Sequence, residues 1–538
     1  MLRNMWMRLS IICGCIVLHS WYAMSCSTSC ICFKKVNVFC FGESVTEIPK
    51  DIPINATELM FLETSIDMID NATIISYEML NKLVFMKNKI QYIHENAFHL
   101  LNLRDLEISA NPLSELRSGL FGELPELRKL TITYNVISIL PCGLFLNNKK
   151  LEVLSLQGNN ISFICKDAFK NLLNLIELNL SSNEIKTLSY NLFQPLKQLR
   201  ILKLNNNQIH DLYPDTFTHL GELRELTLNG NYITFIFKYT FKMLVSLEKL
   251  NLMSNSIKTL TSEVFASLSS LSFLTLERNQ INVLPIRIFD AMKNLTILSL
   301  SENKLKTIPE NIFSSLVKVE KIFLSYNQIE KLEGDIFHGL DSITHLYLDN
   351  NNISLIDSNV FSHIKSLNAI VLHHNKLTML PEGLLDELYN MYSLGLHDNP
   401  WLCNCSLSYL LKWIKENQDL TQVSEIECAG PDNKIGKSIQ LLHLKDLECP
   451  MVENDPDILS PSLLQGGQQL QKSHNVCNYN LINGTLHFDC DLTVCNSMNV
   501  QVSISQNSNT STFIHNASDI LPHCTDTKIN VVITTGTT

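Results

Sequence analysis

Hydrophobic and polar positions repeat with one fixed period through most of the chain. The segment 175–193, LIELNLSSNEIKTLSYNLF, shows the repeating unit, with apolar residues on both sides of Asn183 and a phenylalanine after them. That asparagine recurs in steps of 24 residues at Asn111, Asn135, Asn159, Asn183, Asn207, Asn231, Asn255, Asn279, Asn303, Asn327, Asn351, Asn375 and Asn399. Asn88 extends the series upstream by a step of 23 residues, and Thr64 holds the same position one repeat earlier. Self-similarity at such a period indicates stacked copies of one supersecondary unit.

The period and the spacing L-x-x-L-x-L-x-x-N-x-L are typical of leucine-rich repeats. Each unit predicts a short strand, such as 178–180, whose leucines point inward. The chain must turn after the strand, and the asparagine amide offers two donors and an acceptor to the backbone groups that the turn buries. The sequence therefore predicts an α/β-type repeat, a leucine-rich-repeat solenoid with a curved parallel β-sheet on its concave face.

A second column of large apolar residues lies on the return segment of each repeat. It comprises Phe98, Phe121, Phe145, Phe169, Phe193, Phe217, Phe241, Phe265, Phe289, Phe313, Phe337 and Phe361, and Leu385 replaces phenylalanine in the last full repeat. One repeat cannot bury its own apolar face, whereas stacking on its neighbours does. We therefore expect a continuous core with a phenylalanine column and an asparagine ladder.

The first residues have the pattern of a secretory signal peptide. Arg3 and Arg8 form a basic start, and an apolar run follows from Leu9 to about Leu18. The small residues Ala23 and Ser25, on either side of Met24, offer a cleavage site. The run is shorter than a membrane-spanning helix, so an uncleaved anchor is the less favoured alternative. The net charge of −11 argues against a nucleic-acid partner. We expect a protein secreted into the extracellular space, such as plasma, with no membrane anchor.

Sixteen cysteines in a secreted chain favour disulfide bonds over zinc sites. One group precedes the repeats and another follows them, and both resemble the cysteine-rich caps of extracellular leucine-rich-repeat proteins. A solenoid has two apolar ends that need such covers. The resemblance implies the pairs Cys26–Cys32, Cys30–Cys40, Cys403–Cys428 and Cys405–Cys449.

Cys142 and Cys165 lie in adjacent repeats and outside the repeat pattern. Neighbouring strands are about 5 Å apart, and this separation is within disulfide reach. We favour a bridge between them, with two buried free thiols as the alternative.

The chain divides into six predicted parts. These are a signal peptide (1–25), an N-terminal cap (26–57), about 14 repeats (58–396), a C-terminal cap (397–450), a linker rich in Pro, Gly and Gln (451–472) and a four-cysteine β-rich tail module (473–538). The tail contains Cys477, Cys490, Cys495 and Cys524, which allow three pairings between which the sequence does not choose.

Ten N-x-S/T sequons predict glycosylation. They are Asn55, Asn71, Asn160, Asn179, Asn294, Asn352, Asn483, Asn509 and Asn516, and less favoured Asn404, which lies between two cap cysteines. Asn179 stands between two inward leucines, so its side chain is expected to point out from the concave sheet. A glycan there would cover the middle of that surface.

The sequence contains no catalytic constellation, neither a G-x-S-x-G element nor a phosphate-binding glycine loop. His219 and Glu222 match the zinc-binding H-x-x-E spacing, but they flank the core position Leu220 in an ordinary link between repeats. We predict no catalytic site, no metal site and no cofactor.

A candidate partner patch lies on the outward concave positions of the last repeats. Its members are Phe323, Tyr326, His345, Tyr347, His373 and His397, with Asp349, His374 and Asp398 beside them. Aromatic residues are enriched in interface cores, so a binding surface is one interpretation. The alternative interpretation is that these residues are ordinary solvated groups on the surface. A metal held by Asp349, His373 and His397, which occupy one column, is a further alternative.

The whole chain resembles the family of regulatory subunits (subunit 2) of plasma carboxypeptidase N. The likeness rests on the degenerate first repeat LMFLETSI, the unbroken 24-residue spacing, the cap sequence NPWLCNC and the tail CNYNLINGTLHFDCDLTVC with its distal Cys524. The resemblance implies a non-catalytic subunit that binds and stabilises the catalytic subunit of a zinc carboxypeptidase. That enzyme removes C-terminal Lys and Arg from peptides, and the implied assembly has two catalytic and two regulatory subunits.

The alternative function is an extracellular ligand-binding protein or growth-factor carrier, similar to the acid-labile subunit or to Toll-like ectodomains. Such a protein would hold its ligand in the arc of the repeats. Neither reading gives this chain a catalytic activity of its own.

Overall fold

The computed structural model describes residues 23–449, apart from 28–29, 34–35, 71–73, 75, 418–421, 424 and 448, and the backbone of five strands between 476 and 534. The chain divides into two compact units, 1–450 and 451–538. Most of the predicted signal peptide and the whole predicted linker lie outside the described residues. Among the described helices, none has the length and apolar character needed to cross a bilayer.

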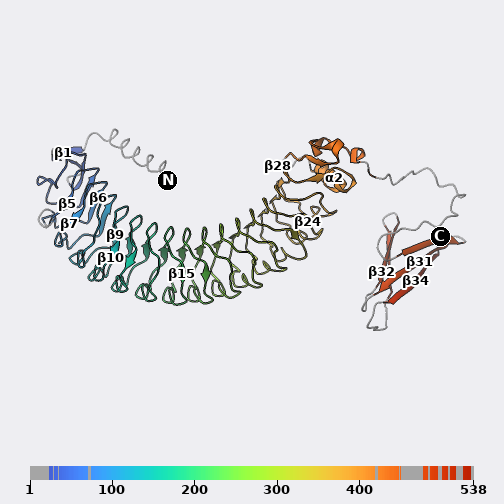
Figure 1. Ribbon diagram of the computed structural model, residues 1–538, viewed down its shortest axis with the longest axis horizontal. Helices are drawn as coiled ribbons and strands as arrows, with labels where there is room; N and C mark the ends of the chain where they lie inside the picture. The colour runs from blue at the N-terminus through green and yellow to red at the C-terminus, as the bar shows by residue number, and fades with distance from the viewer. Residues whose placement is uncertain are drawn as a thin grey trace. The chain divides into compact units, whose positions relative to one another are not determined.

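The first unit is an arc of stacked repeats built on a 19-stranded sheet (Figure 1). One parallel strand comes from each repeat, and Leu178 pairs with Leu154 on one side and Leu202 on the other. The parallel strands are β3 (Asn37–Phe41), β4 (Glu58–Leu62), β6 (Lys82–Met86), β8 (Asp105–Ser109), β9 (Lys129–Thr131), β11 (Val153–Ser155), β13 (Glu177–Asn179), β14 (Ile201–Lys203), β16 (Glu225–Thr227), β18 (Lys249–Asn251), β19 (Phe273–Thr275), β20 (Ile297–Ser299), β21 (Lys321–Phe323), β23 (His345–Tyr347), β25 (Ala369–Val371), β26 (Ser393–Gly395) and β28 (Gln422–Val423). This confirms the predicted solenoid with its curved parallel sheet.

Short strand pairs and tight turns form the return side of the repeats. Leu196, for example, donates its backbone N–H to the carbonyl of Phe193 at 3.0 Å, and both side chains are buried. The short pairs are β5 (Met68–Ile69) with β7 (Tyr92–Ile93), β10 (Ile139–Leu140) with β12 (Phe163–Ile164), β15 (Asp211–Leu212) with β17 (Phe235–Ile236), and β22 (Lys331–Leu332) with β24 (Leu355–Ile356). On this side of the described repeats, consecutive turns bring the apolar residues inward.

The predicted phenylalanine column is the centre of the core. Neighbouring rings stack with centroids 6.0 to 6.3 Å apart along Phe98–Phe145, Phe193–Phe265 and Phe289–Phe361. Burying one such side chain contributes about 1.5–3 kcal/mol. Each ring therefore stabilises its own repeat and the contact with the next one.

The asparagine ladder connects the turns, as Asn231 shows. Its amide nitrogen donates to the carbonyls of Leu204 at 3.0 Å and Leu228 at 2.9 Å. Its Oδ1 accepts the backbone N–H of Ile209 at 3.0 Å. One buried side chain thus satisfies three backbone groups of two repeats, and the same pattern recurs from Asn159 to Asn399.

The N-terminal end of the sheet is closed by antiparallel strands. β1 (Ala23–Ser27) pairs with β2 (Cys30–Phe33), which pairs in turn with β3. A disulfide joins Cys30 to Cys40, the pair that the cap resemblance implies. Cys32 is also disulfide-bonded, whereas the side chain of Cys26 lies outside the described residues.

The C-terminal end is covered by a helix and two disulfides. The cap contains β27 (Trp401–Leu402), η1 (Cys405–Leu407), α2 (Ser408–Glu416), β29 (Cys428–Gly430), η2 (Asp432–Lys434), η3 (Ile439–Leu441) and η4 (Leu444–Leu447). Cys403 is bonded to Cys428 and Cys405 to Cys449. Trp401 is fully buried, and its indole N–H donates to the carbonyl of Leu396 at 3.0 Å. The cap therefore lies directly on the last repeat.

Cys142 and Cys165 are also joined by a disulfide. They follow the paired strands β10 and β12, in which Leu140 lies opposite Ile164. The bridge therefore ties the return segments of two adjacent repeats.

The second unit is β-rich, as its alternating sequence predicted. β30 (Val476–Ile482), β31 (Thr485–Val494) and β34 (Thr525–Thr534) form an antiparallel sheet, and β32 (Val500–Gln506) pairs with β33 (Asn509–His515). Cys477 and Cys490 are partners in the register of β30 and β31. Cys495 and Cys524 lie outside the described residues, so the pairing in the tail stays open.

Tyr409 attaches helix α2 to the last repeat, which yields a test of the cap. Its hydroxyl accepts the backbone N–H of Leu385 at 2.8 Å and donates to Asp386 at 2.9 Å. Tyr409→Phe should lower the free energy of unfolding by about 1 kcal/mol, because a part-buried N–H loses its acceptor. Urea denaturation measures this change, with the exposed Tyr389→Phe as the control. Equal stability of the two variants would contradict this attachment.

Candidate binding surface on the concave sheet

Two aromatic rings lie at the centre of the candidate patch. Phe323 and Tyr347 are register partners on β21 and β23. Their rings stack with centroids 4.6 Å apart and planes within 4° of parallel. Since alternate strand residues face the same side, their neighbours Ile322 and Leu346 are fully buried. The sheet therefore presents a flat aromatic face to the concave side.

His345 lies on the same strand as Tyr347 and adds a third ring to this face. Its ring lies 6.2 Å from the Tyr347 ring, and its Nε2 is 3.1 Å from the hydroxyl of Tyr392. Burial, followed by the charge of the adjacent Lys321, lowers the pKa of His345. The lowered pKa favours the neutral ring, so His345 adds an aromatic and polar group to the patch beside the cationic Lys321.

Side-chain size decreases along one column of the patch. The register aligns Phe323, Tyr347, Val371 and Gly395 on successive strands. A methyl group on Gly395 would come within 3.3 Å of Val371. The concave surface therefore steps down from the aromatic pair toward the C-terminal cap.

Histidines gather beside that step. The rings of His373 and His397 stack with centroids 4.2 Å apart, and Nδ1 of His373 is 2.9 Å from Nδ1 of His374. Asp398 contacts His397 Nδ1 closely and lies 3.4 Å from His374 Nε2. Burial is the largest influence that lowers the pKa of His373, whereas Asp349 opposes the shift.

Two residues of the patch are placed differently from the sequence interpretation. Asp349 shares the column of His373 and His397, but its carboxylate is buried and accepts hydrogen bonds from Ser325 and Asn350. Among the described residues, the group whose ligand atoms lie near one another comprises His373, His374 and His397 and does not include Asp349. Tyr326 lies in the turn after β21 at a φ of 55°, exposed at the margin of the patch.

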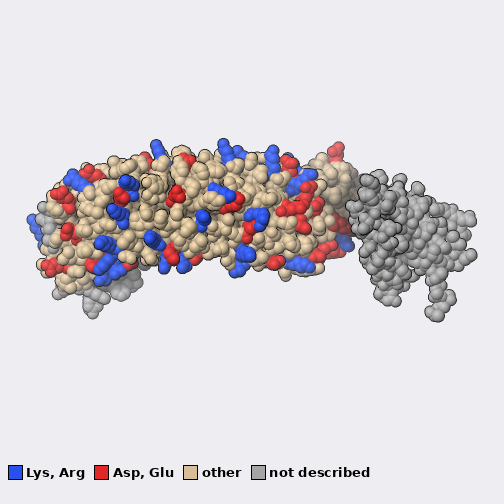
Figure 2. Space-filling view, turned by 90° about the horizontal axis from the view of Figure 1, so that it is seen from below, with Lys and Arg blue, Asp and Glu red and all other residues tan. Residues whose placement is uncertain are grey.

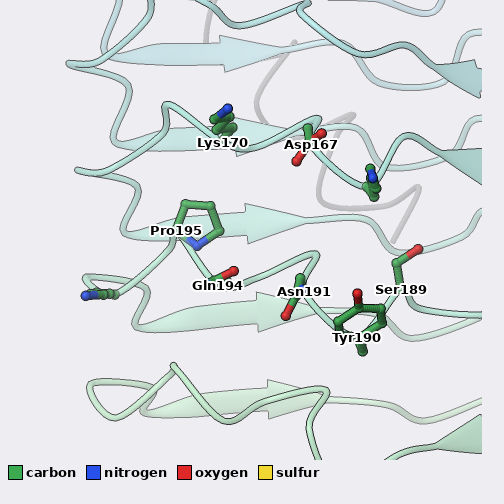
Figure 3. A pocket seen from close by; sticks show the side chains of 9 residues that line it. Asp167, Lys170, Ser189, Tyr190, Asn191, Gln194 and Pro195 are labelled. Carbon is green, nitrogen blue, oxygen red and sulfur yellow. The ribbon is translucent and has the colours of Figure 1, made fainter.

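The return side of the solenoid carries a hollow of a different kind. It measures about 410 Å³ and is lined by residues of two successive repeats, among them Lys166, Asp167, Lys170, Tyr190 and Gln194. Figure 3 shows these side chains spread along two return segments without converging on one point. His219 and Glu222 are likewise exposed on either side of buried Leu220. These residues offer solvated polar surface rather than an arrangement for chemistry.

Charges on the convex face are mostly interspersed. Figure 2 shows basic and acidic side chains alternating over most of this face, with acidic ones gathered toward the end that carries β24 and α2. Exposed charges of the described repeats also pair between neighbouring repeats, as Arg224 does with Glu248 and Arg278 with Glu302. Such exposed pairs contribute little to stability, and they leave the concave aromatic patch as the more distinctive surface.

The predicted glycosylation sites differ in their surroundings. Asn55, Asn160, Asn294 and Asn404 are exposed, and Asn352 is half-buried. Asn179 is buried on β13, where its amide nitrogen donates to Gln157 and its Oδ1 accepts from Ser181. A glycan on Asn179 would be attached to the same amide nitrogen that donates to Gln157. The side chains of Asn71, Asn483, Asn509 and Asn516 lie outside the described residues.

The chain belongs to the leucine-rich-repeat family. The family's repeat profile matches residues 101–161, 149–209, 191–233, 221–281, 274–329, 293–353, 318–377 and 341–400, and these stretches together cover more than half of the 538 residues. In this chain, the structural features that correspond to the family are the 24-residue period, the buried asparagines and the stacked parallel strands.

Among individual proteins, the chain is similar to human carboxypeptidase N subunit 2, with 35% identity over 118 residues. The match covers 20% of this chain and 22% of the human protein, so it spans about a fifth of that relative's length. A leucine-rich-repeat protein of Leptospira interrogans superposes with a TM-score of 0.61 and 26% identity, covering 70% of this chain and 93% of the other. Toll from Drosophila, in its complex with Spätzle, superposes with a TM-score of 0.58 at 18% identity, covering 82% of this chain and 66% of Toll, and shows the shared fold.

Proposed function

We propose that this chain is a secreted, non-catalytic regulatory subunit that binds and stabilises the catalytic subunit of a zinc carboxypeptidase. The similarity to human carboxypeptidase N subunit 2 carries the proposal. The enzyme would be one that removes C-terminal Lys or Arg from extracellular peptides. The assembly would contain two catalytic and two regulatory subunits. The disulfides of both caps and of Cys142–Cys165 fit an oxidising extracellular compartment.

The candidate partner patch supports docking on the concave side of the last repeats. Phe323 and Tyr347 form a preordered aromatic face on adjacent strands, and little side-chain entropy is lost when such rigid groups bind. Stacked repeats also hold the arc in shape, so a large surface is available without rearrangement. A bound enzyme would gain stability by mass action, about 2.7 kcal/mol when the subunit is present at a hundred times its Kd.

Co-purification from plasma tests the proposed function. The full chain, immobilised through a C-terminal tag, should recover an activity that removes C-terminal Lys and Arg from a synthetic peptide. Recovery of a growth factor or cytokine without that activity would instead support the alternative, an extracellular carrier or Toll-like ligand-binding protein. Turnover of the peptide by the purified chain alone would contradict the non-catalytic role.

Substitutions in the patch test the docking surface. Phe323→Ala combined with Tyr347→Ala should reduce the affinity for the catalytic subunit at least about tenfold, because buried aromatic anchors dominate interface energy. The affinity is measured by surface plasmon resonance. Tyr190→Ala on the return side is the matched control, since Tyr190 is exposed and distant in the sequence from the patch. Equal affinity of the patch variant and the control would place the interface elsewhere.

A glycan in the middle of the arc provides a second test. Ser181→Ala removes the sequon at Asn179 and keeps the asparagine itself. Binding of the catalytic subunit should stay unchanged if docking occurs at residues 323–397. Loss of binding in this variant, with unchanged thermal stability, would move the interface to mid-arc.

A further inference from the structure

The histidine group beside the patch is arranged as a set of metal ligands. One nitrogen of each of His373, His374 and His397 lies within 4.8 Å of the other two. The three residues come from two adjacent repeats, in which strands β25 and β26 are in register. Small rotations of the rings would bring the nitrogens to the spacing of a tetrahedral site, whose metal–nitrogen bonds are about 2.0–2.1 Å.

Asp398 completes the arrangement from behind the rings. Its carboxylate contacts Nδ1 of His397 and lies 3.4 Å from Nε2 of His374. A carboxylate that accepts N–H from one ring nitrogen fixes the tautomer and leaves the lone pair on the other nitrogen. Histidines that bind metals almost always have such a partner. Asp398 makes such a hydrogen bond with His397, and its carboxylate also lies close to His374.

The surroundings leave space for the rings and attract cations. Gly395 has no side chain, and a methyl group there would come within 3.4 Å of the His373 ring. A hollow of about 420 Å³ next to His397 and Asp398 is also lined by Glu425 and Glu427 of the cap. Acidic groups around a hollow raise the local concentration of cations.

We propose that His373, His374 and His397 bind a divalent transition-metal ion of the zinc class, with Asp398 orienting two of the imidazoles. Imidazole nitrogens suit Zn²⁺, Cu²⁺ and Ni²⁺, whereas Mg²⁺ and Ca²⁺ prefer oxygen ligands. Three protein nitrogens would leave a fourth tetrahedral position for water or another ligand. The proposal concerns metal binding by the isolated chain and does not depend on the carboxypeptidase partner.

Titration of the full-length chain, free of any histidine tag, with ZnCl₂ tests the proposal. Isothermal titration calorimetry should show one equivalent of bound Zn²⁺. The double variant His374→Ala/His397→Ala should lose this binding, and Asp398→Asn should weaken it about 10–100-fold. A hundredfold excess of Ca²⁺ should not displace the ion.

The matched control is His363→Ala. His363 is an exposed histidine that packs against His338 with ring centroids 5.0 Å apart and lies 4.0 Å from Asp335. His363 is therefore a histidine like the proposed ligands, but it does not belong to a group of three neighbouring histidine rings among the described residues. The control should keep the full equivalent of Zn²⁺. The proposal is overturned if the wild-type chain binds no Zn²⁺, if the double variant keeps its binding, or if Ca²⁺ displaces the ion.

Discussion

Phe217→Ala should lower the free energy of unfolding by about 3–5 kcal/mol, the range for removing a buried phenylalanine. Phe217 is fully buried and stacks on Phe193 and Phe241 with centroids 6.3 and 6.2 Å away. The substitution leaves a cavity that two neighbouring repeats share, so the loss affects both interfaces. Because repeat stabilities couple through nearest neighbours, the repeats around 217 should open first.

Thermal unfolding followed by circular dichroism, together with amide hydrogen exchange, measures both effects. Phe163→Ala is the matched control, because Phe163 is largely exposed on the return side. It should change stability by less than about 0.5 kcal/mol, as surface substitutions usually do. Similar losses for the two variants would show that the phenylalanine column does not carry the core.

Asn231→Ala should cost about 2–4 kcal/mol, although it removes only a small polar group. The side chain makes three hydrogen bonds to buried backbone groups of two repeats. Alanine leaves those groups without partners, and each unsatisfied buried group costs about 1–3 kcal/mol, less whatever water recovers. The melting temperature of the variant measures the loss.

An exposed asparagine distinguishes the ladder from a general effect of the substitution. Asn191 is exposed on the return side, and Asn191→Ala should leave the melting temperature almost unchanged. A melting temperature of Asn231→Ala within error of the wild type would contradict the structural role of the ladder.

The repeat made most of the fold predictable from the sequence. A constant 24-residue step fixes which residues stack, because the parallel register then aligns each residue with its counterpart in the next repeat. Burial followed directly, since Leu178, Asn183 and Phe193 have one role in every copy. The return segments were less predictable, because turns and helices of that length can place similar apolar residues inward.

The candidate site was only partly predictable. Column positions correctly brought His373 beside His397, but they could not show that the carboxylate of Asp349 is buried by a hydrogen bond from Ser325 in the preceding repeat. The same reasoning placed Asn179 outward, but it could not show that the amide is covered and hydrogen-bonded to Gln157 and Ser181. Side-chain rotation and local hydrogen bonding decide these details. The adjacent pair His373-His374 was the signal that could have indicated the histidine group.

Cross-linking of the purified complex with the catalytic subunit tests the central claim most directly. Lys321 lies on β21 beside His345, whereas Lys170 lines the hollow on the return side. An amine-reactive cross-linker followed by mass spectrometry should join the enzyme to Lys321 and its concave neighbours. Cross-links confined to Lys170 and other return-side lysines, or none to the repeats at all, would contradict a scaffold that holds its enzyme on the concave face.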